Sequence, residues 1–173
     1  MTLIEHAQGS EAPSIRTAGV EDIDELLRLL KQVAQVHHVG RPDLFKDGGS
    51  KYDHDSLKEL LGQKDVTVYV AQLPNEQRLA GYAFTMEQHH ESHGAFQPIS
   101  TLYVDDLCVD ETVRGRAIGS RLMEHVFDVA RQQGFYNVTL NVWACNPEAL
   151  AFYKRCGMEV YTYGMERIVN DAQ

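Results

Sequence analysis

Short segments in which apolar and polar residues alternate are separated by segments in which apolar residues recur every three or four positions. Alternation is typical of a β-strand with one buried face, because successive side chains point to opposite sides of the sheet. We therefore predict six strands, at residues 14–18, 66–71, 79–86, 101–109, 136–143 and 158–169. The polar turn at 73–78 joins the second and third strands as a hairpin, and the polar segment 89–100 is predicted to be a loop.

The helical period predicts four helices, at about residues 21–36, 55–62, 118–133 and 147–156. Apolar residues on one face of the first helix are Ile23, Leu26, Leu27, Leu30, Val33 and Ala34. Asp55 or Ser56 is expected to cap the second helix. Asn146 is expected to cap the fourth, because a proline follows it at the first helical position.

Length and composition indicate one soluble domain. The chain has 173 residues, of which 43% are hydrophobic and 24% charged, which is enough for a proper core. We expect a single domain over residues 1–173, with residues 1–13 flexible because they show no period. The net charge of −9 argues against nucleic acids and anionic membranes as partners and is compatible with cationic small molecules or basic peptides.

The chain has three cysteines, Cys108, Cys145 and Cys156. They form no C-x-x-C pair, so neither a disulfide framework nor a four-cysteine zinc site is expected. His89, His90 and His93 resemble a metal cluster, but their polar surroundings indicate a solvated loop, and no metal is expected. No apolar run has the length of a membrane span or signal segment, so the cytoplasm is the expected location.

The strand, turn and helix around Gly115 carry the clearest chemical signal. A glycine-containing loop leads directly into an amphipathic helix, whose first N–H groups have no partner within the helix and carry a partial positive charge. Gly115 and Gly119 allow a ligand to approach the backbone, while Arg114, Arg116 and Arg121 add positive charge. This arrangement predicts a site for a phosphate or pyrophosphate group.

Two motifs and the order of elements resemble the GNAT superfamily of acyl-CoA-dependent N-acyltransferases over nearly the whole chain. The pyrophosphate loop of that family, Arg/Gln-x-x-Gly-x-Gly/Ala, corresponds to residues 114–119, and its Asn-x-x-Ala-x-x-Phe-Tyr motif corresponds to residues 146–153. Ala117 stands where the family usually has glycine. If this position needs a positive φ, the methyl group costs about 1 kcal/mol, whereas the conformation of a helix start accepts alanine freely.

The resemblance implies an α/β (α+β) fold with a mixed, mostly antiparallel central sheet of six to seven strands, which contains a splayed parallel pair and is flanked by about four helices. It implies acetyl-CoA as the cosubstrate, with the pantetheine arm between strands 101–109 and 136–143, where they part into a V. The residues expected to bind acetyl-CoA are Leu107, Cys108, Val109, Arg114, Gly115, Arg116, Ala117, Ile118, Gly119, Ser120, Asn146, Ala149 and Tyr153.

Two adjacent aspartates precede the backbone expected to bind the acyl group, where the N–H of Cys108 is expected to hold the thioester oxygen. An alkylammonium must lose a proton before it can attack a thioester, so a base is required. Because adjacent strand residues point to opposite faces, we expect only one aspartate to face the cleft. Asp105, on the face of Leu107 and Val109, is the preferred base, directly or through a water, and Asp106 is the second candidate. Either could instead cap an element or pair with an arginine.

Tyr153 is the expected proton donor to the leaving CoA thiolate, by its place in the second motif and its O–H group; the alternative is a core tyrosine. Asn146 is expected to contact the pantetheine arm as well as to cap its helix. Cys108 has no histidine partner at a suitable spacing and is expected to pack against ligand or core. Residues 40–52 are expected to lie over the acceptor site.

These residues predict an N-acetyltransferase that acts through direct amine attack in a ternary complex. A similar acidic pair occurs in the polyamine-acetylating branch of the family, so the expected acceptor is a cationic small amine or a lysine-like group. The alternative is a non-catalytic acyl-CoA-binding sensor or interaction domain on the same fold. A nucleotide-dependent phosphotransferase is ranked last, because no Gly-Lys-Ser/Thr follows the loop. A homodimer through the last strands is common in the family.

Overall fold

Five strands form one sheet, in the order in which they occur along the chain. The computed structural model describes residues 12–92, 94–95 and 97–169. The strands in this part of the chain are β1 (Ser14–Thr17), β2 (Val66–Gln72), β3 (Leu79–His90), β4 (Ile99–Val109) and β5 (Asn137–Leu140). The helices are α1 (Ile23–Gly40), α2 (His54–Leu61), α3 (Ile118–Gln133) and α4 (Pro147–Arg155), with short 3-10 turns at η1 (Val20–Asp22) and η2 (Glu111–Val113).

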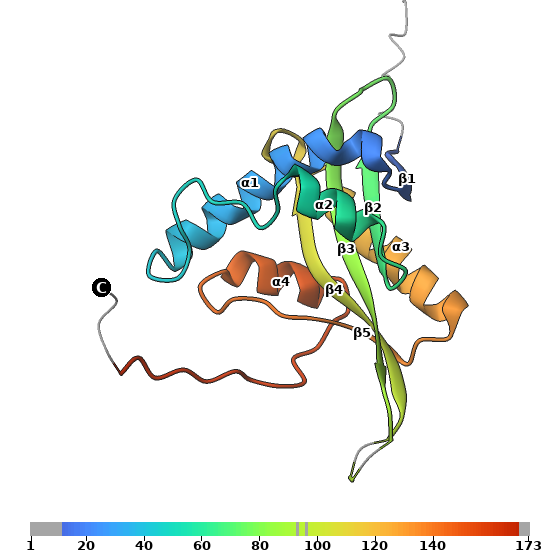
Figure 1. Ribbon diagram of the computed structural model, residues 1–173, viewed down its shortest axis with the longest axis vertical. Helices are drawn as coiled ribbons and strands as arrows, with labels where there is room; N and C mark the ends of the chain where they lie inside the picture. The colour runs from blue at the N-terminus through green and yellow to red at the C-terminus, as the bar shows by residue number, and fades with distance from the viewer. Residues whose placement is uncertain (1–11, 93, 96, 170–173) are drawn as a thin grey trace, which may run out of the picture.

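Helices cover both faces of the sheet. In Figure 1, α1 and α2 lie on one face and α3 on the other. On the first face, the buried side chains of Leu26 in α1 and Phe84 in β3 belong to one apolar cluster. On the second face, Leu122 in α3 and Val104 in β4 belong to another. The cluster to which an apolar residue of β4 belongs shows which face of the sheet its side chain points to.

β4 and β5 are parallel neighbours over a short stretch. Their register runs from Thr101 opposite Asn137 to Val104 opposite Leu140. β4 continues to Val109, so residues 105–109 have no partner in β5. The other neighbouring strands are antiparallel, and α4 lies beside the opening between β4 and β5 (Figure 1). The mixed sheet with its parallel pair and the four helices confirm the predicted class of fold.

The predicted number of six to seven strands is wrong for the described residues. The segment 158–169, expected as a last strand, has no regular secondary structure. Its alternation is weak, and its apolar side chains from Val160 onward are exposed, so no buried face holds it against the sheet. Conversely, part of the predicted loop 89–100 is strand, since the β3–β4 ladder continues to His90 opposite Ile99. This part of the hairpin is largely polar, so apolar alternation could not reveal it.

Two predicted helix boundaries are also corrected. α1 continues past His37 to Gly40, and the His37 ring packs against Phe45, with ring centroids 5.0 Å apart. The cap of α2 is Asp53 rather than Asp55 or Ser56, and its carboxylate accepts a hydrogen bond from the Ser56 N–H at 2.9 Å.

Most of the N-terminal segment that the sequence predicts to be flexible, residues 1–11, lies outside the described residues. Within the described ranges, no helix combines the length and the apolar character needed to cross a membrane.

Candidate active site

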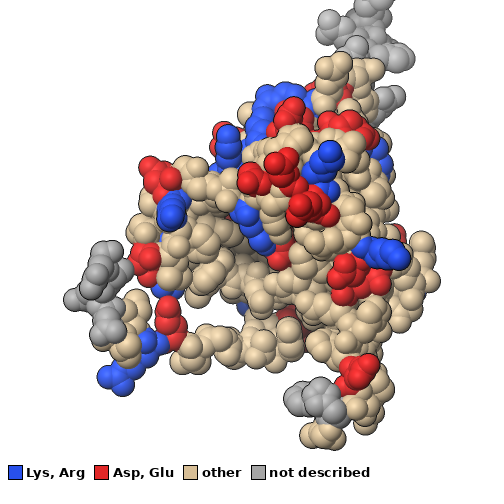
Figure 2. Space-filling view, viewed as in Figure 1, with Lys and Arg blue, Asp and Glu red and all other residues tan. Residues whose placement is uncertain are grey.

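An open cleft of about 2570 Å³ begins where β4 and β5 diverge. Figure 2 shows the molecule hollowed between the α1 side and the C-terminal segment. The cleft is lined by the second half of β4, the loop before α3, α4, the segment after α1, and residues 156–166. An ion pair of Arg41 with Glu166, at 2.8 Å, ties that last segment to the end of α1. Single small-ligand sites usually measure about 300–1,000 Å³, so this cleft has room for two ligands.

The loop before α3 has the backbone of an anion cradle. Gly115 has φ +83° and Ala117 lies in the left-handed region with φ 58° and ψ 16°. No side chain of Ala117 can cap α3, so the first N–H groups of this helix remain available to a ligand. The left-handed conformation of Ala117 settles the alternative left open by the sequence: alanine occupies a position that favours glycine.

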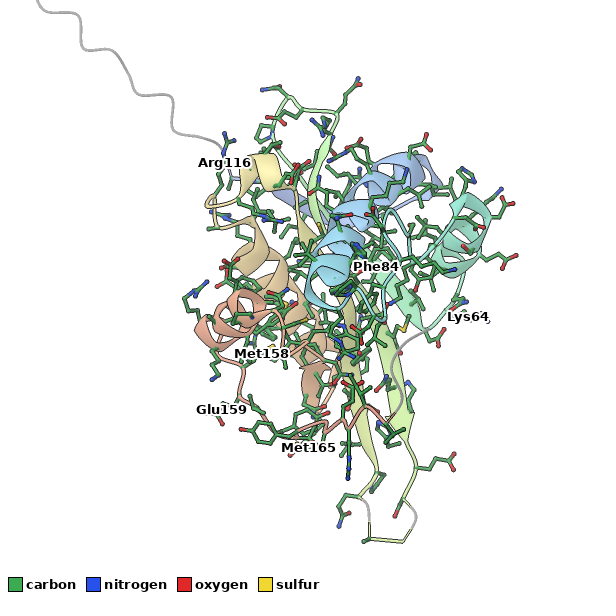
Figure 3. The ribbon with its side chains drawn as sticks, turned by 90° about the vertical axis from the view of Figure 1, so that its left-hand side faces the viewer. Lys64, Phe84, Arg116, Met158, Glu159 and Met165 are labelled. Carbon is green, nitrogen blue, oxygen red and sulfur yellow. The ribbon has the colours of Figure 1, made fainter. Side chains whose placement is uncertain are left out.

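Gly119 allows α3 to approach α4 and β4 closely. A Cβ atom at this position would lie 3.1 Å from Cζ of Phe152 and 3.3 Å from Cγ2 of Val109. The residues predicted to bind acetyl-CoA all line the cleft, with one exception. Arg116 does not line the cleft; it lies at the outer part of the loop (Figure 3).

A β-bulge in β4 changes the orientation of the two aspartates. Phe84 of β3 pairs with Asp106 and Thr85 pairs with Val104, so Asp105 is an extra residue in β4. Strict alternation is interrupted there, and the premise that only one aspartate faces the cleft is wrong. Asp106 shares the face of its partner Phe84, and Asp105 turns to the same side, where it meets Lys51.

The predicted companions of Asp105 lie on the opposite face. Leu107 and Val109 pack with the α3 cluster. The prediction that Asp105 shares a face of the sheet with Leu107 and Val109 is therefore wrong.

Asp106 is partly buried between β3 and the cleft. The phenolic O–H of Tyr82 donates to its Oδ2 atom at 3.2 Å. Burial raises the pKa of Asp106 to about 6, although the nearby charge of Lys51 and the hydrogen bond from Tyr82 act in the opposite direction. A carboxylate with this pKa is largely ionised at neutral pH and is a stronger base than an ordinary aspartate.

Asp105 makes an ion pair with a residue far away in sequence. Nζ of Lys51 lies 2.5 Å from Oδ2 of Asp105 and 5.6 Å from the ring centroid of Tyr52. The ring of Tyr52 in turn stacks on Phe84. The sequence placed residues 40–52 over the acceptor site but gave no sign of this pair, since it joins positions 54 residues apart.

Tyr153 lines the cleft on α4, beside the ring of Phe152. Burial and the negative charge of Asp106 raise the pKa of Tyr153 above its ordinary value, so its phenol keeps its proton at neutral pH. Asn146 caps α4 by accepting a hydrogen bond from the Ala149 N–H at 3.1 Å, and both residues line the cleft.

The backbone of β4 presents its free groups to the opening. Asp110 donates its N–H to the Ala80 carbonyl at 2.9 Å, and hydrogen-bonded and non-bonded pairs alternate along an antiparallel ladder. The next bonded pair is Cys108 with Tyr82, so the N–H of Cys108 points toward β3. The backbone groups of Leu107 and Val109 point away from β3, toward the side where β5 is missing.

Two other candidates from the sequence, Cys108 and His89, make contacts within the protein. The Cys108 thiol faces the Leu29 carbonyl at 3.6 Å, and burial raises the pKa of Cys108 to about 12, which disfavours a nucleophilic role. His89 accepts or donates a hydrogen bond with Ser100 at 2.9 Å, while His93 lies outside the described residues. Within the described part of the chain, no group of three His, Cys, Asp or Glu residues could hold a metal ion.

Comparisons with known proteins agree with this geometry. Over 151 residues, the chain is 24% identical to thialysine N-epsilon-acetyltransferase of Bos taurus, a match that covers 86% of this chain and 85% of the relative. It is 40% identical over 55 residues to glucosamine 6-phosphate N-acetyltransferase 1 of Oryza sativa subsp. japonica, so it matches only 32% of that relative's length and 32% of its own.

The fold is shared with a crystal structure of a mutant BH1408 protein from Bacillus halodurans. The TM-score is 0.86 at 28% identity, with 91% of this chain and 99% of the other covered. Residues 30–158, which include both motifs, match the acetyltransferase (GNAT) family. This match extends over most of the chain, and the chain therefore belongs to the acetyltransferase (GNAT) family, whose members use acetyl-CoA.

Proposed function

We propose that this acetyltransferase transfers the acetyl group of acetyl-CoA to the primary amine of a cationic small molecule, by direct attack in a ternary complex. The observation that carries the proposal is the β-bulge at Asp105. It turns two carboxylates into the cleft at the point where β5 leaves β4, and Asp106 lies within electrostatic range of Tyr153.

The loop and first turn of α3 are suited to the pyrophosphate of the cosubstrate. The uncapped N–H groups of α3 and the positive end of its dipole attract an anion, and Gly115 leaves space beside the backbone. Arg114 lines the same part of the cleft and adds a positive charge. The outward position of Arg116 limits it to a long-range attraction.

We assign the two aspartates different roles. Asp105, which already holds an alkylammonium group, would bind the ammonium of the acceptor. Asp106, with its pKa raised to about 6 by burial, would take the proton that the acceptor loses before it attacks. The preference for Asp105 as the base depends on strict alternation along β4, which the bulge interrupts.

The free backbone groups of β4 and the phenol of Tyr153 would complete the chemistry. The N–H of Leu107 or Val109, rather than that of Cys108, would donate to the thioester oxygen as negative charge develops there. Tyr153, which remains protonated, would donate its proton to the departing thiolate. Asn146 would contact the pantetheine arm while it caps α4.

The acidic pair favours an acceptor with a second positive charge or an extended alkylamine. Thialysine and glucosamine 6-phosphate, which appear in the names of the relatives above, both contain a primary amine. Because this cleft contains Asp105 and Asp106 together, we expect polyamines and lysine-like amines to react faster than an amine that carries a phosphate group.

The test is a thiol-release assay with acetyl-CoA and a panel of amines: a polyamine, lysine, thialysine and glucosamine 6-phosphate. We expect turnover with the first three and stabilisation of the protein by CoA in a thermal-shift measurement. Tyr153→Phe should lose most turnover and keep the CoA-dependent shift, because it removes only the donated proton. Stabilisation by ATP alone, with no thiol release from any amine, would refute the proposal.

We further propose a homodimer. Tyr163 and Met165 of the C-terminal segment are 83% and 93% exposed, and Figure 3 labels Met165. β5 forms one edge of the sheet in the described chain. Pairing of this segment with the β5 edge of a second copy would bury both surfaces. Sedimentation velocity should give the mass of a dimer, and Met165→Asp should shift it toward the monomer. A monomer at micromolar concentration would contradict this.

A further inference from the structure

A lysine of the protein itself occupies the position proposed for the acceptor. Lys51 reaches into the cleft from the segment between α1 and α2, and its Nζ atom contacts Asp105 at 2.5 Å. An alkylammonium group held by a carboxylate is the same chemical arrangement as a bound primary-amine substrate. Asp105 is 16% exposed and Lys51 45% exposed, and both residues line the cleft.

The surroundings of Lys51 include the carboxylate proposed as the base of the reaction, Asp106. Its charge affects the pKa of Asp106, of Tyr52 and of His37, which places all three within electrostatic range of the ammonium group. The ring of Tyr52 lies close enough for a cation–π contact. Lys51 thus stands beside both the carboxylate that would bind an amine and the one that would deprotonate it.

Lys51 also has room to move toward the acyl group. It lies in a segment without regular secondary structure, two residues after Gly49. Along a strand the rise is about 3.3 Å per residue, so the free backbone of Leu107 begins about 7 Å from Asp105. Rotation about the bonds of the long lysine side chain can cover this distance.

We propose that Lys51 is itself an acceptor: in the absence of an external amine, the protein acetylates the Nζ atom of Lys51 from acetyl-CoA. This inference rests on the proposed function, because it uses the same base and proton donor. The product is a neutral amide, which cannot pair with Asp105 as the ammonium does. Acetylation therefore leaves that carboxylate without its internal partner and open to the ammonium of an external amine.

The reaction balances without any further reagent. Asp106 takes one proton from the Lys51 ammonium, and the nitrogen lone pair then forms the new N–C bond. The C–S bond of the thioester breaks, and the thiolate takes a proton from Tyr153, which regains one from the acetylated nitrogen. One ammonium and one thioester give one amide, one thiol and one proton, which Asp106 returns to water.

Two other lysines of the cleft provide matched controls. In the described chain, Lys46 and Lys154 also line the cleft, but the contact with a candidate catalytic carboxylate belongs to Lys51. Chemical acetylation by a thioester in solution should modify accessible lysines at similar rates, whereas catalysis by the site should select Lys51.

The experiment incubates the full chain with isotopically labelled acetyl-CoA, without an amine, and measures acetylation at each lysine by peptide mass spectrometry. We expect Lys51 to be acetylated at least tenfold faster than Lys46 and Lys154, with release of about one thiol per chain. Tyr153→Phe should slow modification of Lys51 and leave that of the other two unchanged. Lys51→Arg should abolish the release of about one thiol per chain that occurs without an amine, and it should keep the CoA-dependent thermal shift.

Failure of this inference can be distinguished from failure of the proposed function. Equal rates at the three lysines, in a preparation that releases thiol with an external amine, would overturn the acetylation of Lys51 alone. If no amine supports thiol release and CoA gives no thermal shift, the proposed function fails, and the acetylation of Lys51 fails with it.

Discussion

Replacing Ala117 by glycine should stabilise the protein. Ala117 is exposed and lies in the left-handed region, with φ 58° and ψ 16°, immediately before α3. A left-handed backbone costs an L-residue about 1–2 kcal/mol, because Cβ approaches the following carbonyl oxygen. Glycine removes this strain. No buried contact is lost, since the methyl group of Ala117 is not part of either apolar cluster.

The unfolded chain offsets part of this gain. Glycine has more freedom than alanine when unfolded, which costs about 0.4–1 kcal/mol on folding. The difference of these two contributions spans about 0–1.6 kcal/mol, and their mid-range values give an increase of about 0.8 kcal/mol in the free energy of unfolding. For a chain of this size, about 2–4 °C in Tm corresponds to 1 kcal/mol, so Tm should rise by about 1–4 °C.

Urea unfolding followed by circular dichroism measures the change directly. Ala151→Gly is the matched control, because Ala151 is exposed in the middle of α4 and lies outside the cleft lining. The same substitution in a helix interior should destabilise by about 1 kcal/mol. The reasoning is refuted if both variants lose stability to the same extent, since Ala117 would then have no left-handed strain to relieve.

Three further substitutions test the site and its support. Asp106→Asn should lower kcat/KM by about 10²–10⁴-fold. In the unchanged protein, kcat/KM should fall as pH drops below about 6, because the pKa of Asp106 is raised to about 6 and the base is protonated below it. An inflection of the pH profile that persists in the variant would exclude this role. Gly119→Ala should cost about 1–3 kcal/mol in thermal unfolding and weaken CoA binding by calorimetry, because its methyl group meets Phe152 at 3.1 Å. Asp110→Asn should cost about 1.5–3 kcal/mol, because Asp110 is buried and accepts hydrogen bonds from Thr112 and Arg28. Burial raises the pKa of Asp110, but these hydrogen bonds outweigh it and lower the pKa to about 2. The stabilisation by the Asp110 carboxylate is therefore present above pH 4 and is lost as pH falls toward 2. A difference in the free energy of unfolding between the unchanged protein and Asp110→Asn that persists at pH 2 would contradict this.

Local sequence signals predicted the elements that depend on local chemistry. Asn146 followed by a proline marked the start of α4, and the apolar face of residues 23–34 marked α1. The glycine loop before α3 was also recognisable, since its function requires a particular backbone at particular positions. These features depend on residues a few positions apart, which a single sequence displays.

The features that the sequence missed depend on pairing between distant residues. The bulge at Asp105 is a property of the register between β3 and β4, and neither strand shows it alone. The Lys51–Asp105 ion pair joins residues 54 positions apart. The extension of the β3–β4 hairpin is held by backbone hydrogen bonds between largely polar residues, so the pattern of apolar residues does not predict it.

The bulge explains why two adjacent carboxylates can serve one site. In a regular strand, Asp105 and Asp106 would point to opposite faces, and one of them would enter the apolar cluster beneath α3. The extra residue instead turns both toward the α1 side, just beyond the last residue of β4 that pairs with β5. There the two side chains differ in environment: Asp105 meets the ammonium of Lys51, whereas burial raises the pKa of Asp106 to about 6. Two residues of the same type are thereby suited to two tasks, because one holds a cation while the other can accept its proton.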